Sequence, residues 1–218
     1  DSGIGGLTVL KEVRKILPNE HIIYLGDTAR VPYGNKSPQT ITKYALESAI
    51  FLLTKGIKIL VVACNTSSAL ALGVLQKKLP VPVLGVIEPG AKEAVRHSKN
   101  KKIGIIGTKA TISSMAYVNA MKRLDPDIEV FSKPCPLFVP IAEEGLENDK
   151  VAIFMAEKYL EELKACGSDT LVLGCTHYPL LEWAIKTTPG DGITIINTGI
   201  ETAKEVQKTL DKKRILND

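Results

Sequence analysis

The sequence predicts an α/β fold built from two similar domains, and two observations carry this prediction. Stretches rich in aliphatic and β-branched residues alternate along the chain with segments of helical spacing. Two of these stretches, residues 58–64 and 169–175, look like copies of one another, and each ends in a cysteine. A continuous apolar run of this kind indicates a strand buried on both faces of a parallel sheet. Its carboxyl end is where open α/β sheets bind ligands.

The spacing of the two cysteines supports a duplicated unit. Cys64 and Cys175 lie 111 residues apart, about the length of one domain. Asp1 to Cys64 covers 63 residues and Gly107 to Cys175 covers 68, so Asp1 corresponds to Gly107 in the second copy. We therefore expect a cleft between two domains in which the two thiols face each other.

Composition limits the class of protein. The 218 residues are 44% hydrophobic with a mean hydropathy of +0.08, as in a globular protein with an ample core. No apolar run approaches the ~18 residues that cross a bilayer, and no signal-like segment opens the sequence, so we expect a cytoplasmic protein without membrane contact. The net charge of +4 is scattered and aromatic residues are only 5%, which argues against a nucleic-acid partner.

The first elements follow from local patterns. Residues 1–6 form a glycine-rich loop that enters an amphipathic helix. Such a loop normally follows a strand, so we expect the functional protein to carry further residues before it. The apolar run 22–25 predicts a strand, and residues 26–34 form a long loop at its end. Apolar positions at helical spacing predict a helix over 38–53.

The first cysteine strand is followed by small polar residues. The hydroxyl and amide groups of residues 65–68 predict a cap for a helix over 69–79. An apolar run then predicts a strand over 83–87. Glu88 and Pro89 end that strand and open a helix through Val95.

The pattern restarts at Lys102 with a strand and a glycine turn. The same criteria predict the remaining elements. They are strands at 103–108, 128–131, 169–174 and 193–196, a loop over 134–145 that contains Glu143, and helices at 112–124, 150–165, from about 180, and 202–210.

The four cysteines contain no C-x-x-C pair, which argues against a zinc ribbon or a thioredoxin-type motif. Cys135 lies between two prolines and Cys166 near a helix end, so both are expected to be packing or surface thiols. A thiol at a helix N-terminus is more acidic because the helix dipole favours the thiolate. His177 follows Cys175 by two residues and can exchange a proton with it.

Three hypotheses fit these residues. A metal site of Cys64, Cys175 and His177 needs a fourth ligand and leaves the glycine loops unexplained. A non-catalytic, two-lobed amino-acid-binding protein would use the cleft without needing thiols. A symmetric pair of acid/base thiols suits proton exchange at a carbon, in which one thiol removes the proton and the other returns it on the opposite face.

Seven strings in this sequence resemble, in their order, those of the cofactor-independent aspartate/glutamate racemase family, and among its members the glutamate racemases. The resemblance covers essentially the whole chain, and GDTARVPYG with LGCTHYP is highly specific. The strings are DSGIGG, GDTARVPYG, ACNT, VIEPG, IGTKAT, IAEEG and LGCTHYPLL. The resemblance implies two pseudo-symmetric flavodoxin-like domains with glutamate bound between them. It also implies a reaction that needs no cofactor and that supplies D-glutamate for peptidoglycan.

The resemblance also implies roles for individual residues. Cys175 handles the L enantiomer and Cys64 the D enantiomer, while Asp1, Glu143 and His177 assist or tune the thiols. Asp27 matches a family position, although a structural role in its loop is an equal alternative. The residues implied to hold the substrate are Asp1, Ser2, Tyr33, Gly34, Asn65, Thr66, Thr176 and His177.

We divide the chain into a first domain of residues 1–90 plus 200–218 and a second domain of residues 91–199, and we expect a homodimer. An aspartate or other amino-acid racemase of the same family remains the alternative activity. Two departures from the family pattern stand out. Members normally begin with a strand before DSG and continue past the last helix, and an Asp-Ser pair is more usual where this sequence has Asn197 and Thr198.

Overall fold

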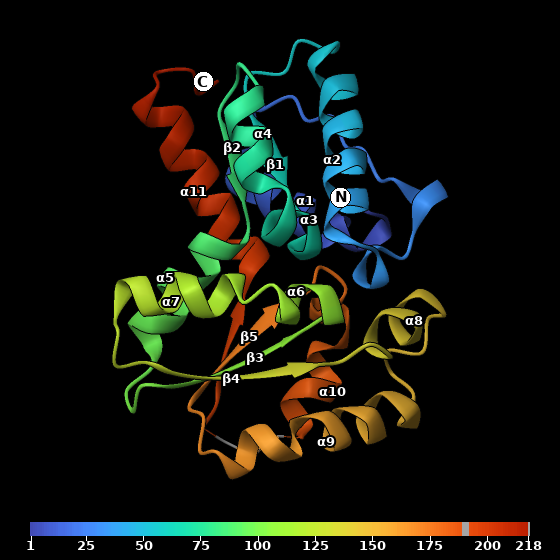
Figure 1. The fold of residues 1–218 in the computed structure, drawn as a ribbon, viewed down its shortest axis with the longest axis vertical. Helices are drawn as coiled ribbons and strands as arrows, with labels where there is room; N and C mark the ends of the chain where they lie inside the picture. Colours follow the sequence, from blue (N-terminus) through green and yellow to red (C-terminus); the bar gives the residue numbers. More distant parts are fainter. Residues whose placement is uncertain (189–191, 218) are drawn as a thin grey trace.

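The computed structural model describes residues 1–188 and 192–217. Residues 189–191 and 218, which fall inside the expected domain ranges, lie outside the described residues. Helices alternate with parallel strands, which confirms the α/β class (Figure 1). The strands are β1 (Leu60–Val62), β2 (Val83–Gly85), β3 (Lys102–Gly107), β4 (Glu129–Pro134), β5 (Thr170–Gly174) and β6 (Thr194–Asn197).

The α-helices connect these strands, and short 3-10 helices occupy several loops. The α-helices are α1 (Leu7–Ile16), α2 (Pro38–Leu53), α3 (Asn65–Leu70), α4 (Leu72–Lys78), α5 (Ile87–His97), α6 (Lys109–Ser113), α7 (Ala116–Leu124), α8 (Phe138–Glu143), α9 (Lys150–Ala165), α10 (Glu182–Thr187) and α11 (Thr198–Lys212). The 3-10 helices are η1 (Ile4–Gly6), η2 (Thr28–Arg30), η3 (Tyr33–Asn35) and η4 (Tyr178–Leu181).

The larger sheet has four parallel strands in the order β4-β3-β5-β6. Its two central strands, β3 and β5, are buried along almost their whole length, as their apolar runs predict, while the edge strands β4 and β6 are partly exposed. Leu171 and Leu173 of β5 pack on the face covered by α8, α9 and α10. Val172, between them, packs on the opposite face against α5 and α7. The central strand therefore places its carboxyl end, Gly174 and the following Cys175, inside the molecule.

The smaller sheet pairs β1 with β2 in parallel. Leu60 and Val62 of β1 pack against α2 and α4, while Ala63 faces α1 and α11. Figure 1 shows this sheet and its helices in the upper part of the molecule and the four-stranded sheet below. Cys64 lies two residues after the end of β1, so both cysteine strands end where the two parts meet.

Helix α11 begins beside the larger sheet and ends beside the smaller one (Figure 1). Its Val206 and Leu210 pack against Val9 and Val13 of α1. The two boundaries expected from the sequence, after residue 90 and after residue 199, fall inside α5 and α11. The division of the chain at these points stays a prediction.

The expected strand at residues 22–25 is wrong. This segment has no assigned secondary structure and pairs with no strand of the described chain, and Ile22 and Ile23 are exposed. Residues 22–25 and residues 57–61 line one groove together. The segment 22–25 does contact Asp1, whose backbone nitrogen donates to Leu25 O at 3.0 Å. A strand assignment requires a hydrogen-bonded neighbour, which apolar periodicity alone does not supply.

Three helix predictions also need correction. Residues 65–68 are the first turn of α3 rather than a cap, and Cys64 itself is the N-cap residue. The expected helix over 112–124 is two helices, because Met115 adopts a left-handed conformation between α6 and α7. The expected loop over 134–145 contains α8, which ends at Glu143.

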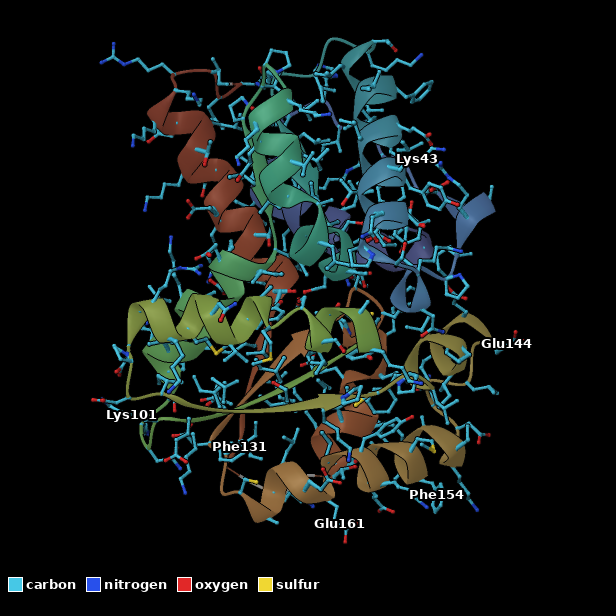
Figure 2. All side chains as sticks on the ribbon, in the orientation of Figure 1. Lys43, Lys101, Phe131, Glu144, Phe154 and Glu161 are labelled. Carbon is cyan, nitrogen blue, oxygen red and sulfur yellow. The ribbon has the colours of Figure 1, made fainter. Side chains whose placement is uncertain are left out.

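The surface carries the charged side chains. Figure 2 shows Lys43, Lys101, Glu144 and Glu161 projecting outward from the ribbon, and each is exposed. Among the described residues, none of the helices is both long and apolar enough to cross a membrane.

Candidate active site

Cys64 and Cys175 line one cavity between the ends of β1 and β5. The cavity has a volume of about 280 Å³. The two cysteines are only 5% and 7% exposed, and both are free thiols. Burial raises the pKa of Cys175, and negative charge on Cys64 raises it further. The carboxyl ends of one strand from each sheet thus bring together residues that are far apart in the sequence.

Every site residue predicted from the sequence lines this cavity except Asp1. Loops, strand ends and helix starts from both parts of the molecule contribute. The predicted residues in the lining are Ser2, Tyr33, Gly34, Cys64, Asn65, Thr66, Glu143, Cys175, Thr176 and His177.

Asp1 lies behind the cavity wall. Its Oδ2 atom accepts hydrogen bonds from the backbone N–H groups of Gly3 at 2.9 Å and Gly6 at 3.1 Å. Thr176 donates its hydroxyl proton to the other oxygen at 3.4 Å. Asp1 and Cys64 line a smaller neighbouring cavity together. Asp1 therefore holds the glycine-rich loop against the Cys175 loop in this conformation.

Cys175, His177 and Glu143 form a chain of contacts. Cys175 Sγ lies 3.8 Å from His177 Nδ1, and His177 Nε2 lies 2.9 Å from Glu143 Oε1. A carboxylate can only accept, so Nε2 carries the imidazole proton and Nδ1 is free to accept the thiol proton. His177 Nδ1, the ring nitrogen that does not contact Glu143, is therefore the proton acceptor available to Cys175.

Burial sets the protonation of this pair. It raises the pKa of the Cys175 thiol to about 12, although the backbone N–H of His177 opposes the shift. It also lowers the pKa of His177, against the opposing effect of the Glu143 carboxylate. At neutral pH the resting pair is therefore a neutral thiol beside a neutral imidazole.

A separate network holds the loop that brings Tyr33 to the cavity. The Tyr33 hydroxyl donates to the Asp27 carboxylate, and burial followed by this bond raises the pKa of Tyr33. Asp27 also pairs with Arg30, N to O 2.7 Å, and Arg30 lies 4.1 Å from the centre of the Tyr44 ring. In this structure Asp27 fixes its loop. This is the structural role that the sequence analysis gave as the alternative to a role implied by the family.

Comparison with known proteins identifies the family. The sequence profile described as Asp/Glu/Hydantoin racemase matches residues 7–206. The chain belongs to this family.

Individual relatives agree with this assignment. This racemase is 55% identical over 210 residues to a glutamate racemase of Geobacter metallireducens, covering 96% of this chain and 78% of the relative. It resembles a solved glutamate racemase of Bacillus anthracis with a TM-score of 0.97 and 44% identity, covering 100% of this chain and 82% of that one. A Francisella tularensis glutamate racemase solved with D-glutamate gives a TM-score of 0.93 and 39% identity, with coverage of 100% and 81%.

The glycines of the racemase permit close approaches in the site. A Cβ on Gly5 would lie 2.5 Å from His177 Nδ1, and one on Gly34 would lie 2.8 Å from Thr108 Cβ. Thr8 completes the first contact by donating its hydroxyl proton to Thr176 O at 2.8 Å. The glycine-rich start of the sequence is therefore required by its packing against the Cys175 loop.

Sequence reasoning missed several lining residues, of which Thr108 is the clearest. The hydroxyls of Thr66, Thr108 and Thr111 lie 3.0–3.2 Å from one another. Thr108 directly follows β3, the neighbour of β5, so its place at a strand end was a usable signal. The other missed lining residues are Val31, Pro32, Asn35, Lys109, Pro136, Val139 and Pro140.

The metal hypothesis lacks a ligand set. Within residues 1–188 and 192–217, no three His, Cys, Asp or Glu side chains are grouped to hold a metal ion. Cys64, Cys175 and His177 share the cavity without forming such a group.

Proposed function

We propose that this racemase interconverts L- and D-glutamate by proton transfer at Cα between two thiols, without a cofactor, and supplies D-glutamate for peptidoglycan synthesis. The observation that carries the proposal is the pair of buried thiols, Cys64 and Cys175, at two strand ends of one cavity. The curated relatives that are 48–55% identical are named glutamate racemases, and the Francisella structure contains D-glutamate.

In this mechanism one thiolate takes the Cα proton and the opposite thiol donates its own proton to the resulting carbanion. Burial makes Cys175 a stronger base once it is ionised, because the same environment that raises its pKa destabilises the thiolate. His177 Nδ1 accepts the thiol proton, and Glu143 stabilises the imidazolium that results. The ammonium group of the bound amino acid adds positive charge that favours the thiolate.

The substrate carboxylates need donors. The hydroxyls of Ser2, Thr66 and Thr176 and the amide of Asn65 lie in the cavity lining and can supply them. Backbone N–H groups at the start of α3, behind Cys64, add further donors. These groups surround the cavity from both sheets, which suits a substrate with a carboxylate at each end.

Circular dichroism tests the activity directly. The reduced protein, with chelator and no added cofactor, is incubated separately with L-glutamate and L-aspartate. We expect the L-glutamate signal to decay to zero and the L-aspartate signal to persist. Decay of the L-aspartate signal alone would favour an aspartate racemase of the same family. If folded protein changed neither signal, a non-catalytic binding protein would be favoured.

His177 should act on one side of the reaction. Because the two enantiomers are equally stable, kcat/KM for His177→Asn must fall equally in both directions, by roughly 10²-fold for loss of a proton-transfer partner. The proton transfers at the two thiols can be told apart by the primary deuterium isotope effects on kcat/KM. Since His177 contacts Cys175, its loss should slow the proton transfer at Cys175. We therefore expect the isotope effect of the variant to be larger than that of the parent with α-deuterated L-glutamate and smaller with α-deuterated D-glutamate. The same change in both isotope effects would contradict this assignment.

We also propose a cytoplasmic homodimer. A catalytic thiol must stay reduced, and all four cysteines are free, which supports a reducing compartment. Exposed Phe154 and Trp183 are apolar side chains that a second copy could cover. Sedimentation velocity of the purified protein should give twice the mass of one chain, and a single species at the mass of one chain would contradict the dimer.

A further inference from the structure

Asn65 is held in the cavity wall by only one end of its amide. The side chain is 2% exposed and belongs to the first turn of α3, directly after Cys64. Its Oδ1 atom accepts a hydrogen bond of 2.6 Å from the Tyr117 hydroxyl. Its Nδ2 atom is buried and has no hydrogen-bond partner in the part of the chain that the structure describes. A buried donor without a partner is costly in a protein, so this group calls for an explanation.

The hydrogen bond from Tyr117 fixes which way the amide points. The oxygen and nitrogen of an amide lie on opposite sides of its carbon, and a hydroxyl that donates selects the oxygen. With Oδ1 turned toward Tyr117, the two N–H bonds of Nδ2 are left for the cavity that Asn65 lines. A substrate carboxylate, which only accepts, is the partner that this orientation suits.

Tyr117 is itself held firmly. It lies on α7, is 3% exposed, and packs between α5 and β5. A Cβ on Gly174 would lie 3.3 Å from Tyr117 Cε2, which is tighter than an ordinary contact, so this glycine makes room for the ring. Burial raises the pKa of Tyr117, which keeps its hydroxyl protonated and able to donate.

We propose that Tyr117 is a positioning residue: its hydroxyl orients the Asn65 amide so that Nδ2 donates to a carboxylate of the bound amino acid. The inference rests on the proposed function, because it assumes an amino-acid substrate in this cavity. It assigns no contact with substrate to Tyr117, which does not line the cavity. The contact also links α7, which follows β3 of the larger sheet, to α3, which follows β1 of the smaller one.

The test is a double-mutant cycle on kcat/KM for L-glutamate. Tyr117→Phe removes the hydroxyl and keeps the ring, and we expect a loss of about tenfold, mainly as a higher KM, since contacting residues couple strongly. In an Asn65→Ala background the same change should alter kcat/KM by less than about twofold, because the group it orients is gone. Tyr178→Phe is the matched control: its buried hydroxyl donates to Cys135 O at 2.9 Å, neither residue lines the cavity, and its loss should leave kcat/KM within about twofold.

A purely structural role for Tyr117 would give a different pattern. Tyr117→Phe would then lower kcat/KM equally in the parent and in the Asn65→Ala background, and that result overturns the proposal. Parent-like kcat/KM for folded Tyr117→Phe overturns it as well. Melting temperatures of all variants show whether each is folded, and the Tyr178→Phe control reports the effect of losing any buried hydroxyl.

Nuclear magnetic resonance separates this inference from the proposed activity. The side-chain N–H₂ signals of Asn65 are assigned by their loss in Asn65→Ala. We expect them to shift in Tyr117→Phe but not in Tyr178→Phe, and to shift when L-glutamate is added to the parent. A parent that shows these shifts but does not racemise glutamate would refute the proposed function alone. Signals that are unchanged by Tyr117→Phe would refute the positioning role alone.

Discussion

Alanine in place of either Cys64 or Cys175 is expected to abolish detectable racemisation of glutamate. Each thiol transfers one of the two protons in the proposed reaction, and loss of a positioned acid or base costs up to about 10⁴-fold. The measurement is the decay of the circular dichroism of L-glutamate at high enzyme concentration. A Cys64→Ala protein that racemises within a few-fold of the parent would refute the two-thiol mechanism.

The other two cysteines provide matched controls. Cys135 is fully buried in the core of the larger sheet, does not line the cavity, and has a pKa raised by burial. Cys166 follows α9 as its C-cap residue. Cys135→Ala and Cys166→Ala should therefore retain most of the activity. A loss in either control as large as the loss in Cys175→Ala would indicate that the effect reflects folding rather than chemistry.

The sequence sufficed for the elements whose physics is local. The cysteine strands are short apolar runs that must be buried, and Cys64 and Cys175 lie, as expected, just after the ends of these strands and line one cavity. Helices α2 and α9 match their predicted ranges because each has helical spacing and a capping residue, Ser37 or Asp149.

The features that could not be predicted depend on contacts between distant segments. Residues 22–25 have the composition of a strand, but the assignment depends on a hydrogen-bonded neighbour. Tyr117 and Asn65 are 52 residues apart, and nothing in the local pattern around either one indicates the other. Thr108 could have been predicted as a site residue, because it directly follows β3, the strand that pairs with the cysteine strand β5.

The placement of Asp1 illustrates the same limit. The resemblance grouped it with the substrate-binding residues, whereas the structure directs its carboxylate to Gly3, Gly6 and Thr176. Its role in tuning Cys64 stays a prediction. The shared small cavity with Cys64 is the structural feature that is compatible with it.

Racemisation in heavy water should place deuterium at Cα of the product from the first turnover. L-Glutamate of natural abundance is mixed with protein equilibrated in heavy water, and early D-glutamate is separated and weighed by mass spectrometry. The thiol that returns the hydrogen exchanged with solvent before the substrate bound, so almost every D-glutamate molecule should carry one deuteron. The remaining L-glutamate should gain little deuterium at early times, because its abstracted proton stays on its own thiol.

This outcome depends on the geometry of two thiols on opposite sides of the substrate. Cys64 and Cys175 follow strands of different sheets and enter the cavity from different parts of the chain. A thiolate that removes a proton from one face of Cα therefore cannot reach the other face with the same proton. A single base that moved between faces would instead return part of the original hydrogen. Substantial protium at Cα of the earliest D-glutamate would thus exclude the two-thiol mechanism, whatever the activities of the cysteine variants.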